Sequence, residues 1–134
     1  MDKSTVRVYF AVSGEDINPT DITHELSLQP IQSWMKGDLI PETNRRREYS
    51  FWSIGTGDEK SLDINEQFNK VFSYLQGKEN TLIEMGCQYE LEYQFNVVIK
   101  VKDEVTPAMH LDNVLLRKVN ALNADISIDL YVYS

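Results

Sequence analysis

Hydrophobic and polar residues alternate along four stretches of the chain, and a period of two is typical of strands that bury one face. These stretches predict strands over residues 5–12, 48–54, 88–101 and 125–133. The third is the most regular, and its alternation favours a sheet that is covered on one face and open to water on the other. In the last strand, the positions predicted to be buried are Ile126, Ile128, Leu130 and Val132.

Hydrophobic residues spaced three and four apart, together with capping residues, predict three helices. The first begins at Pro19 after the N-cap residue Asn18, and the second follows the N-cap residue Asp63. A short helical turn is expected over residues 80–85, and the third helix is expected over residues 112–120 with Asp112 as its cap. The elements therefore alternate along the chain in the order β-α-β-α-β-α-β.

This order predicts an α+β fold. A chain of 134 residues has an ordinary size for one domain, so we expect residues 1–134 to form a single α+β domain. The expected architecture is a two-layer sandwich related to the ferredoxin-like pattern, with a four-stranded, mainly antiparallel sheet and the helices on one face. Residues 5–54 and 89–133 each follow the order strand, helix, strand, which predicts a weak internal repeat.

Residues 30–47 form an unusually long connection, and loops of this length are often functional or mobile. The connection contains Lys36-Gly37-Asp38, where glycine permits a positive φ and its charged neighbours could hold a ligand. The same three residues also suit an ordinary turn. A run of arginines, Arg45–Arg47, follows in the same connection, beside Glu42 and Glu48.

Four segments carry a resemblance to a known family. They are the capped helix Pro19–Leu28, the Lys36–Asp38 loop, the aromatic strand Tyr49–Trp52 and the closing segment Asp125–Tyr131. Together they resemble the bacterial family named domain of unknown function 4279. The resemblance draws attention to a local unit of residues without giving any of them a role: Trp34, Lys36, Gly37, Asp38 and Trp52.

The net charge of −8, from thirteen basic and twenty-one acidic residues, excludes two classes of partner. Nucleic acids and anionic membrane surfaces are bound through lysine and arginine, so neither is expected here. A basic protein suits the charge better, although acidity also serves solubility. The single cysteine, Cys87, permits no internal disulfide, and neither a signal peptide nor a membrane-spanning run is apparent. These features favour the cytoplasm.

No motif in the sequence predicts catalysis, a metal site or a cofactor. The two histidines, His24 and His110, lie far from each other and from Cys87, without the spacing of zinc ligands. Cys87 suits a small core residue better than a nucleophile. Gly55 and Gly57 lack the third glycine of a dinucleotide-binding motif. We therefore expect a protein that is not an enzyme.

The polar face of the predicted sheet is the strongest candidate binding surface. Strand parity places carboxylates and tyrosines on this face: Tyr9, Glu90, Glu92, Asp129, Tyr131 and Tyr133. Tyrosine is favoured at protein interfaces, and carboxylates around it would steer a basic partner. The ordinary alternative is a solvated face on which Arg7 pairs with one of the carboxylates.

Three hypotheses for function follow. The favoured one is a non-enzymatic protein-binding module, for example an immunity-type inhibitor of a basic toxin. The second is a small-ligand-binding protein or enzyme that uses the Lys36–Asp38 loop, with Trp34 or Trp52 as a stacking wall. The third is a homodimeric structural module that pairs through the open sheet face.

Overall fold

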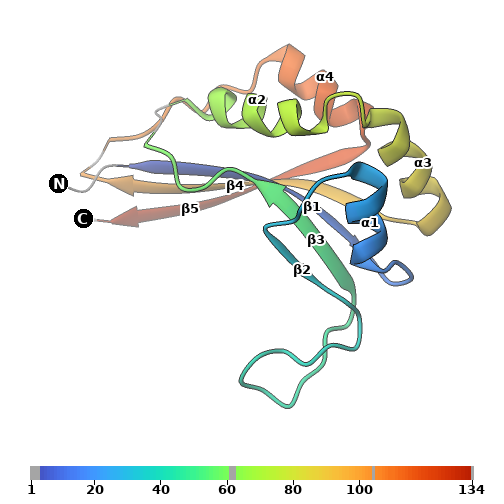
Figure 1. Cartoon of the computed structure of the whole chain (residues 1–134). Helices are drawn as coiled ribbons and strands as arrows, with labels where there is room; N and C mark the ends of the chain where they lie inside the picture. The colour runs from blue at the N-terminus through green and yellow to red at the C-terminus, as the bar shows by residue number, and fades with distance from the viewer. Residues whose placement is uncertain (1–3, 61–62, 104, 134) are drawn as a thin grey trace.

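The chain forms one mixed sheet with four helices on a single face (Figure 1). The computed structural model describes residues 4–60, 63–103 and 105–133. The strands are β1 (Thr5–Gly14), β2 (Gln32–Trp34), β3 (Ser50–Gly55), β4 (Glu92–Lys102) and β5 (Ala124–Tyr133). The helices are α1 (Pro19–Leu26), α2 (Ile64–Leu75), α3 (Glu79–Tyr89) and α4 (Asn113–Ala121).

The strand order is β2-β3-β1-β4-β5, so the first strand of the chain lies at the centre of the sheet. β1 pairs antiparallel with both β3 and β4, and β2 pairs antiparallel with β3. β4 and β5 are parallel, as a strand–helix–strand crossover requires. The α+β class and the mostly antiparallel sheet are thus confirmed.

The core lies between the sheet and the helices. Val6, Val8, Phe10 and Val12 of β1 are all buried, as their alternation predicts. Phe10 and Phe95 meet at the centre of the sheet with ring centroids 5.0 Å apart, and Phe68 of α2 packs on Phe95 at 5.6 Å. Aromatic pairs at these separations add to the stabilisation that burial itself provides.

The predicted caps begin three of the helices. The side chain of Asn18 accepts a hydrogen bond from the Thr20 N–H, and that of Asp63 accepts one from the Asn65 N–H. Asp112 caps α4 by accepting from the Leu115 N–H at 2.8 Å. Each cap satisfies a backbone donor that has no partner within its helix.

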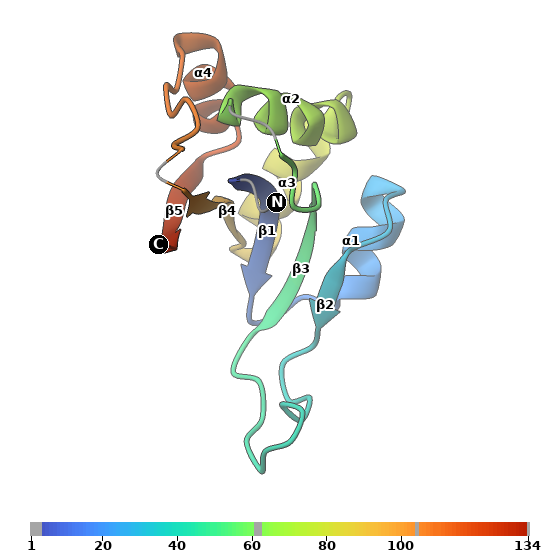
Figure 2. The ribbon, with the colours of Figure 1, turned by 90° about the vertical axis from the view of Figure 1, so that its left-hand side faces the viewer.

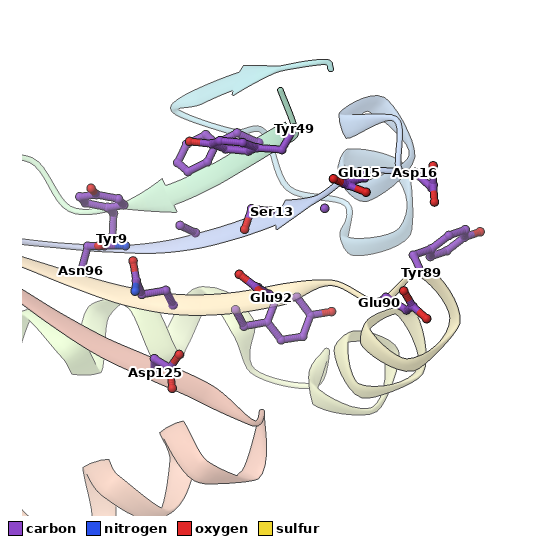
Figure 3. Close-up of a pocket in the computed structure, with 15 residues that line it drawn as sticks. Tyr9, Ser13, Glu15, Asp16, Tyr49, Tyr89, Glu90, Glu92, Asn96 and Asp125 are labelled. Carbon is purple, nitrogen blue, oxygen red and sulfur yellow. The ribbon is translucent and has the colours of Figure 1, made fainter. Parts of the chain in front are cut away.

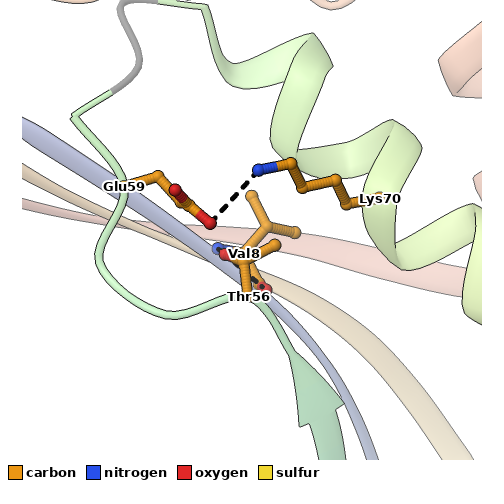
Figure 4. Close-up of polar contacts among 4 residues, drawn as sticks. All are labelled: Val8, Thr56, Glu59 and Lys70. Carbon is orange, nitrogen blue, oxygen red and sulfur yellow. Dashed lines mark hydrogen bonds and ion pairs between the residues drawn. The ribbon is translucent and has the colours of Figure 1, made fainter.

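The segment that follows β3 continues to pair with β1 (Figure 4). The Thr56 N–H donates to the Val8 carbonyl, and the Val8 N–H donates to the Thr56 hydroxyl at 3.1 Å. Glu59 then exchanges two backbone hydrogen bonds with Val6 and makes a 3.1 Å ion pair with Lys70 of α2. Because this ion pair is about half exposed, the backbone pairing is the stronger restraint on the segment.

The prediction of four strands is wrong, because β2 is a fifth strand. β2 has only three residues, which is too short to give a readable alternation, and it forms by pairing with β3. The observed order of elements is β-α-β-β-α-α-β-α-β. The two expected repeats are also unlike, because β1 and β3 are antiparallel whereas β4 and β5 are parallel.

The short turn predicted at 80–85 is a full helix of eleven residues, α3. Tyr89, assigned to the third strand from its alternation, is the last residue of this helix. The helix ends where Glu90 adopts a left-handed conformation with φ of 54°, and β4 begins at Glu92. Cys87 lies on α3 and is exposed, so its prediction as a core residue is also wrong.

The prediction that β5 buries one face is wrong as well. Ile128, Leu130 and Val132 are exposed, and Ile126 is half-buried. β5 is the outermost strand, and α4 packs against it without covering its C-terminal half (Figure 2). Alternation identified the strand correctly, but it could not show where the covering layer ends.

Gly55 occupies a position with no room for a side chain. It lies opposite Tyr9 in the β1–β3 pair, and a Cβ atom there would lie 2.6 Å from the Tyr9 Cα. We expect Gly55→Ala to lower the free energy of unfolding by about 1–3 kcal/mol, because the strand backbones must separate. Gly57→Ala is the matched control, since a Cβ atom there meets nothing within 4 Å. Urea denaturation measures both, and equal effects would contradict this explanation.

Candidate functional site

A cleft of about 630 Å³ opens on the face of the sheet opposite the helices, where β1 ends and β4 begins (Figure 3). We call it the acidic cleft. Its carboxylates are Glu15, Asp16, Glu90, Glu92 and Asp125, and its aromatic side chains include Tyr9, Tyr49, Phe51 and Tyr89. The cleft also includes smaller and amide side chains of β1 and β4, among them Ser13, Gln94 and Asn96.

Sheet register brings these residues together from distant parts of the sequence. Ser13 lies opposite Glu92, and Tyr9 lies opposite Asn96, so β1 and β4 supply the floor of the cleft. Asp125 of β5 lies beside Gln94 of β4. The floor of the cleft therefore depends on the pairing of β1 with β4, a strand about eighty residues later in the sequence.

Two turns supply the remaining carboxylates. Glu15 and Asp16 follow β1 directly, and Figure 3 shows them at the same end of the cleft as Glu90 and Tyr89. Glu90 reaches this place through its left-handed backbone, whose N–H donates to the Gly86 carbonyl to close α3. A non-glycine residue is uncommon in this conformation.

The charge of the cleft is not balanced by its own lining, which contains no lysine, arginine or histidine. Within the described part of the chain, the ion pairs are Glu59–Lys70 and Asp58–Lys100, and neither involves a cleft carboxylate. A concave surface lined by charges of one sign concentrates the field and attracts ions of the opposite sign. The acidic cleft is therefore suited to a cation.

The arrangement of the carboxylates does not suit a metal ion. Across the residues that the structure describes, no three histidine, cysteine, aspartate or glutamate side chains are close enough to hold one. The carboxylates instead are spread along the cleft, with Tyr89 beside Asp16 and Glu90 and with Tyr9 and Tyr49 to one side of Glu92 (Figure 3). Rings and separated carboxylates suit an organic cation, which can contact a ring face and a carboxylate together.

The predicted binding face is thus divided into two parts. Tyr9, Glu90 and Glu92 line the acidic cleft. The other three predicted residues lie on the polar side of β5, outside the cleft lining: Asp129, Tyr131 and Tyr133.

Tyr9 links these two parts. Burial raises the pKa of the Tyr9 hydroxyl above its ordinary value, and the charge of Arg7 opposes that rise. Asp129 and Tyr131 lie close enough to add to the rise in the pKa of Tyr9. Arg7 lies over the Tyr9 ring at 5.5 Å and makes no ion pair with a described residue, so the Arg7–carboxylate pair of the ordinary alternative is not observed.

Sequence parity missed most of the acidic cleft. Glu15 and Asp16 lie in a turn, so no strand pattern marks them, and Tyr89 lies at the end of a helix although alternation assigned it to the third strand. Asp125 has the correct parity on β5 and could have been included with Asp129.

The Lys36–Asp38 loop is part of a projecting segment, residues 35–49, which we call the arm (Figures 1 and 2). Gly37 has a φ of 95°, and the Asp38 carboxylate accepts a hydrogen bond from the Met35 N–H at 2.8 Å. The Gly37 N–H donates to the Arg47 carbonyl, and the Arg47 N–H donates to the Asp38 carbonyl. Gly37 and Asp38 therefore have structural roles in a turn, and Lys36 is exposed beside them.

The two tryptophans lie on opposite faces of the sheet. Trp34 stacks on Phe51 with a centroid distance of 4.4 Å, and the Arg47 guanidinium covers the Trp34 ring at 3.8 Å. Trp52 is fully buried in the core, where its indole N–H donates to the Thr23 hydroxyl at 3.0 Å. The structure therefore does not place Trp52 beside the Lys36–Asp38 loop.

Comparison with known proteins gives a family. The model of the family described as "domain of unknown function (DUF4279)" matches residues 4–133, which is nearly the whole chain. The chain belongs to this family. No curated protein and no solved structure matches the chain significantly. Family membership therefore confirms the resemblance seen in the sequence and leaves the chemistry to be argued from the acidic cleft.

Two further observations bear on function. None of the helices in the described part of the chain is long and apolar enough to cross a lipid bilayer. His24 and His110 are both exposed, on α1 and in the segment before α4.

The different surroundings of the tryptophans predict different effects of their removal. Trp52→Ala should lower the free energy of unfolding by about 3–5 kcal/mol, because it leaves a cavity in the core and removes the hydrogen bond from the indole to the Thr23 hydroxyl. Trp34→Ala removes stacking on a half-exposed surface and should cost about 0.5–1.5 kcal/mol. Urea denaturation of both variants tests the assignment. A larger effect for Trp34 would contradict the placement of Trp52 in the core.

Proposed function

We propose that this chain is a non-enzymatic binding module that holds a basic segment of a partner protein in the acidic cleft. One observation carries the proposal: five carboxylates and five aromatic residues line a single concavity that has no basic residue in its lining. The sequence contains no catalytic motif that would suggest an enzymatic function instead.

The size and chemistry of the acidic cleft favour a polypeptide as the ligand. A volume of about 630 Å³ is within the range of ligand sites and accommodates a few side chains. Arginine can pair with a carboxylate through two hydrogen bonds and stack on a tyrosine ring at the same time. A nucleic acid would bring phosphates against the same carboxylates and would be repelled.

The partner class follows from this chemistry. A protein with exposed arginine or lysine would be attracted to the acidic cleft over a distance of about 8–10 Å at moderate salt. An immunity-type inhibitor, which blocks a basic toxin in the cytoplasm, is the biological role that we infer from a small acidic binding module. Tyr131 and Tyr133 on β5 would extend the contact beyond the acidic cleft.

A fluorescent hexa-arginine peptide is a direct probe of the acidic cleft. We expect binding that weakens as salt is added, and Glu92→Lys should weaken it at least about tenfold, because a repulsive charge replaces an attractive one. Glu84→Lys is the matched control, since Glu84 is exposed on α3 outside the acidic cleft and the change in net charge is the same. Fluorescence anisotropy measures both variants. If the two substitutions weaken binding equally, the change in net charge alone explains the weaker binding, and the acidic cleft is rejected as the site.

A second experiment tests the protein partner. Tagged wild-type chain and the two variants are each incubated with a lysate of the source organism, and bound proteins are identified by mass spectrometry. We expect one basic protein to be retained by the wild type and by Glu84→Lys, and lost with Glu92→Lys. A protein that all three retain would bind elsewhere on the chain, and the proposed function would then be wrong.

A further inference from the structure

We propose that β5 is a self-association edge, at which two copies of this chain pair antiparallel and join their sheets into one. The proposal concerns the edge of the sheet and does not depend on what the acidic cleft binds. It rests on three properties of β5: its exposed apolar side chains, its regular backbone and a sequence that can pair with a second β5 strand running in the opposite direction.

The first property is the exposure of large hydrophobic side chains at an outer strand. Five of the last six residues of β5 are exposed by between 47% and 69%: Ile128, Leu130, Tyr131, Val132 and Tyr133. Ile128, Leu130 and Val132 lie on the side of the sheet that carries the helices, and the two tyrosines lie on the other side. An apolar surface of this kind on an edge strand is typical of a contact with another chain.

The second property is the regularity of β5. Its ten residues pair with β4 in continuous parallel register, from Tyr93–Ala124 to Lys102–Tyr133, with no bulge. A regular outer strand offers unpaired backbone N–H and C=O groups at even spacing to a further strand. The opposite edge of the sheet differs, because β2 has only three residues.

β5 also lacks the features that usually prevent edge pairing. Lysine and proline are the common protective residues at a strand edge, and β5 contains neither. Its charged residues are Asp125, near the start of the strand, and Asp129.

The third property identifies the partner as a second copy of this chain. Two β5 strands that run in opposite directions can pair with favourable side chains facing each other. A two-fold axis at Leu130 would set Ile128 opposite Val132 and Leu130 opposite itself on the helix side. On the other side, Asp129 would face Tyr131, and Ser127 would face Tyr133. No carboxylate would face another, whereas an axis at Asp129 would set two aspartates against each other, which is unfavourable.

Neighbouring residues would enlarge the contact. Val114 and Leu116 are exposed on α4, which packs against β5 (Figure 2). A two-fold axis perpendicular to the sheet would bring the helix layers of both copies to the same side. Val114 and Leu116 are two residues apart and lie on opposite flanks of α4, so at most one of them can face the joint. Contact between the two α4 helices would add to the pairing of residues 127–133 toward the roughly 800 Å² that each partner buries in a standard interface.

The net charge of the chain predicts how this association depends on salt concentration. Two chains that each carry a charge of −8 repel each other, so added salt should strengthen the pairing by screening. Binding of a basic peptide in the acidic cleft should instead weaken with salt. The two proposals therefore respond in opposite directions, and one can fail without the other.

Sedimentation equilibrium and light scattering on the whole chain test the proposal. We expect a reversible dimer, favoured by salt, whose dissociation constant rises at least about tenfold in Leu130→Lys, because two lysines would meet at the axis. Ile31→Lys is the matched control, since Ile31 is a comparably exposed residue (60%) beside β2 at the other edge. Its dimer should equal that of the wild type. A chain that remains monomeric at high concentration and high salt, or a dimer that both variants weaken equally, would overturn the proposal.

Cross-linking tests the register. In a Cys87→Ser background, Leu130→Cys should form a disulfide-linked dimer under mild oxidation, because facing residues of antiparallel strands lie about 4.5–5.5 Å apart. Val132→Cys should not cross-link, since its counterpart in the other copy would lie roughly 14 Å away along the strands. Equal cross-linking at the two positions would reject the axis at Leu130. A strand of a different protein at this edge would leave the purified chain monomeric and uncross-linked, which would also reject self-association.

Discussion

The placement of all four helices on one face of the sheet is the constraint on which the rest of the structure depends. The buried side chains of α1, α2, α3 and α4 enter one core with the inner face of the strands, including Ile22, Phe68, Leu82 and Leu115. Burial of this apolar surface is the main stabilising term in the fold. It also leaves the outer face of the sheet to carry polar chemistry, because nothing in the described part of the chain covers that face as the helices cover the inner one (Figure 1).

The acidic cleft follows from that division. Glu92 on β4, Glu15 after β1 and Asp125 on β5 all lie at one end of the outer face, so their charges combine although they are far apart in the sequence. Carboxylates that share one cleft repel each other and oppose the compact state, even when they stand apart. A bound cation would relieve this repulsion, so the native chain would be stabilised by the same ligand that the acidic cleft attracts.

Sequence signals correctly predicted the elements whose formation depends only on neighbouring residues. Asn18, Asp63 and Asp112 cap helices as expected, because a capping hydrogen bond needs only neighbouring residues. α3 was underestimated since its N-terminus has no side-chain cap, and β2 was missed since it exists only through its pairing with β3. Parity found Tyr9 and Glu92 in the acidic cleft, whereas Glu15 and Tyr89 depend on how turns and helix ends meet in three dimensions. Relationship to the ferredoxin-like pattern and binding of a basic partner stay predictions.

The central position of β1 has a consequence for how the chain acquires its structure during synthesis. Thr5 pairs with Lys100 and Val8 with Val97, so one side of the first strand has no partner until about a hundred residues have been made. Pairing across such a sequence separation slows folding, because closing a long loop costs entropy before the contacts between the strands stabilise it. The edge of β1 that receives β4 therefore stays unpaired through most of translation, and an unpaired strand edge is prone to aggregation.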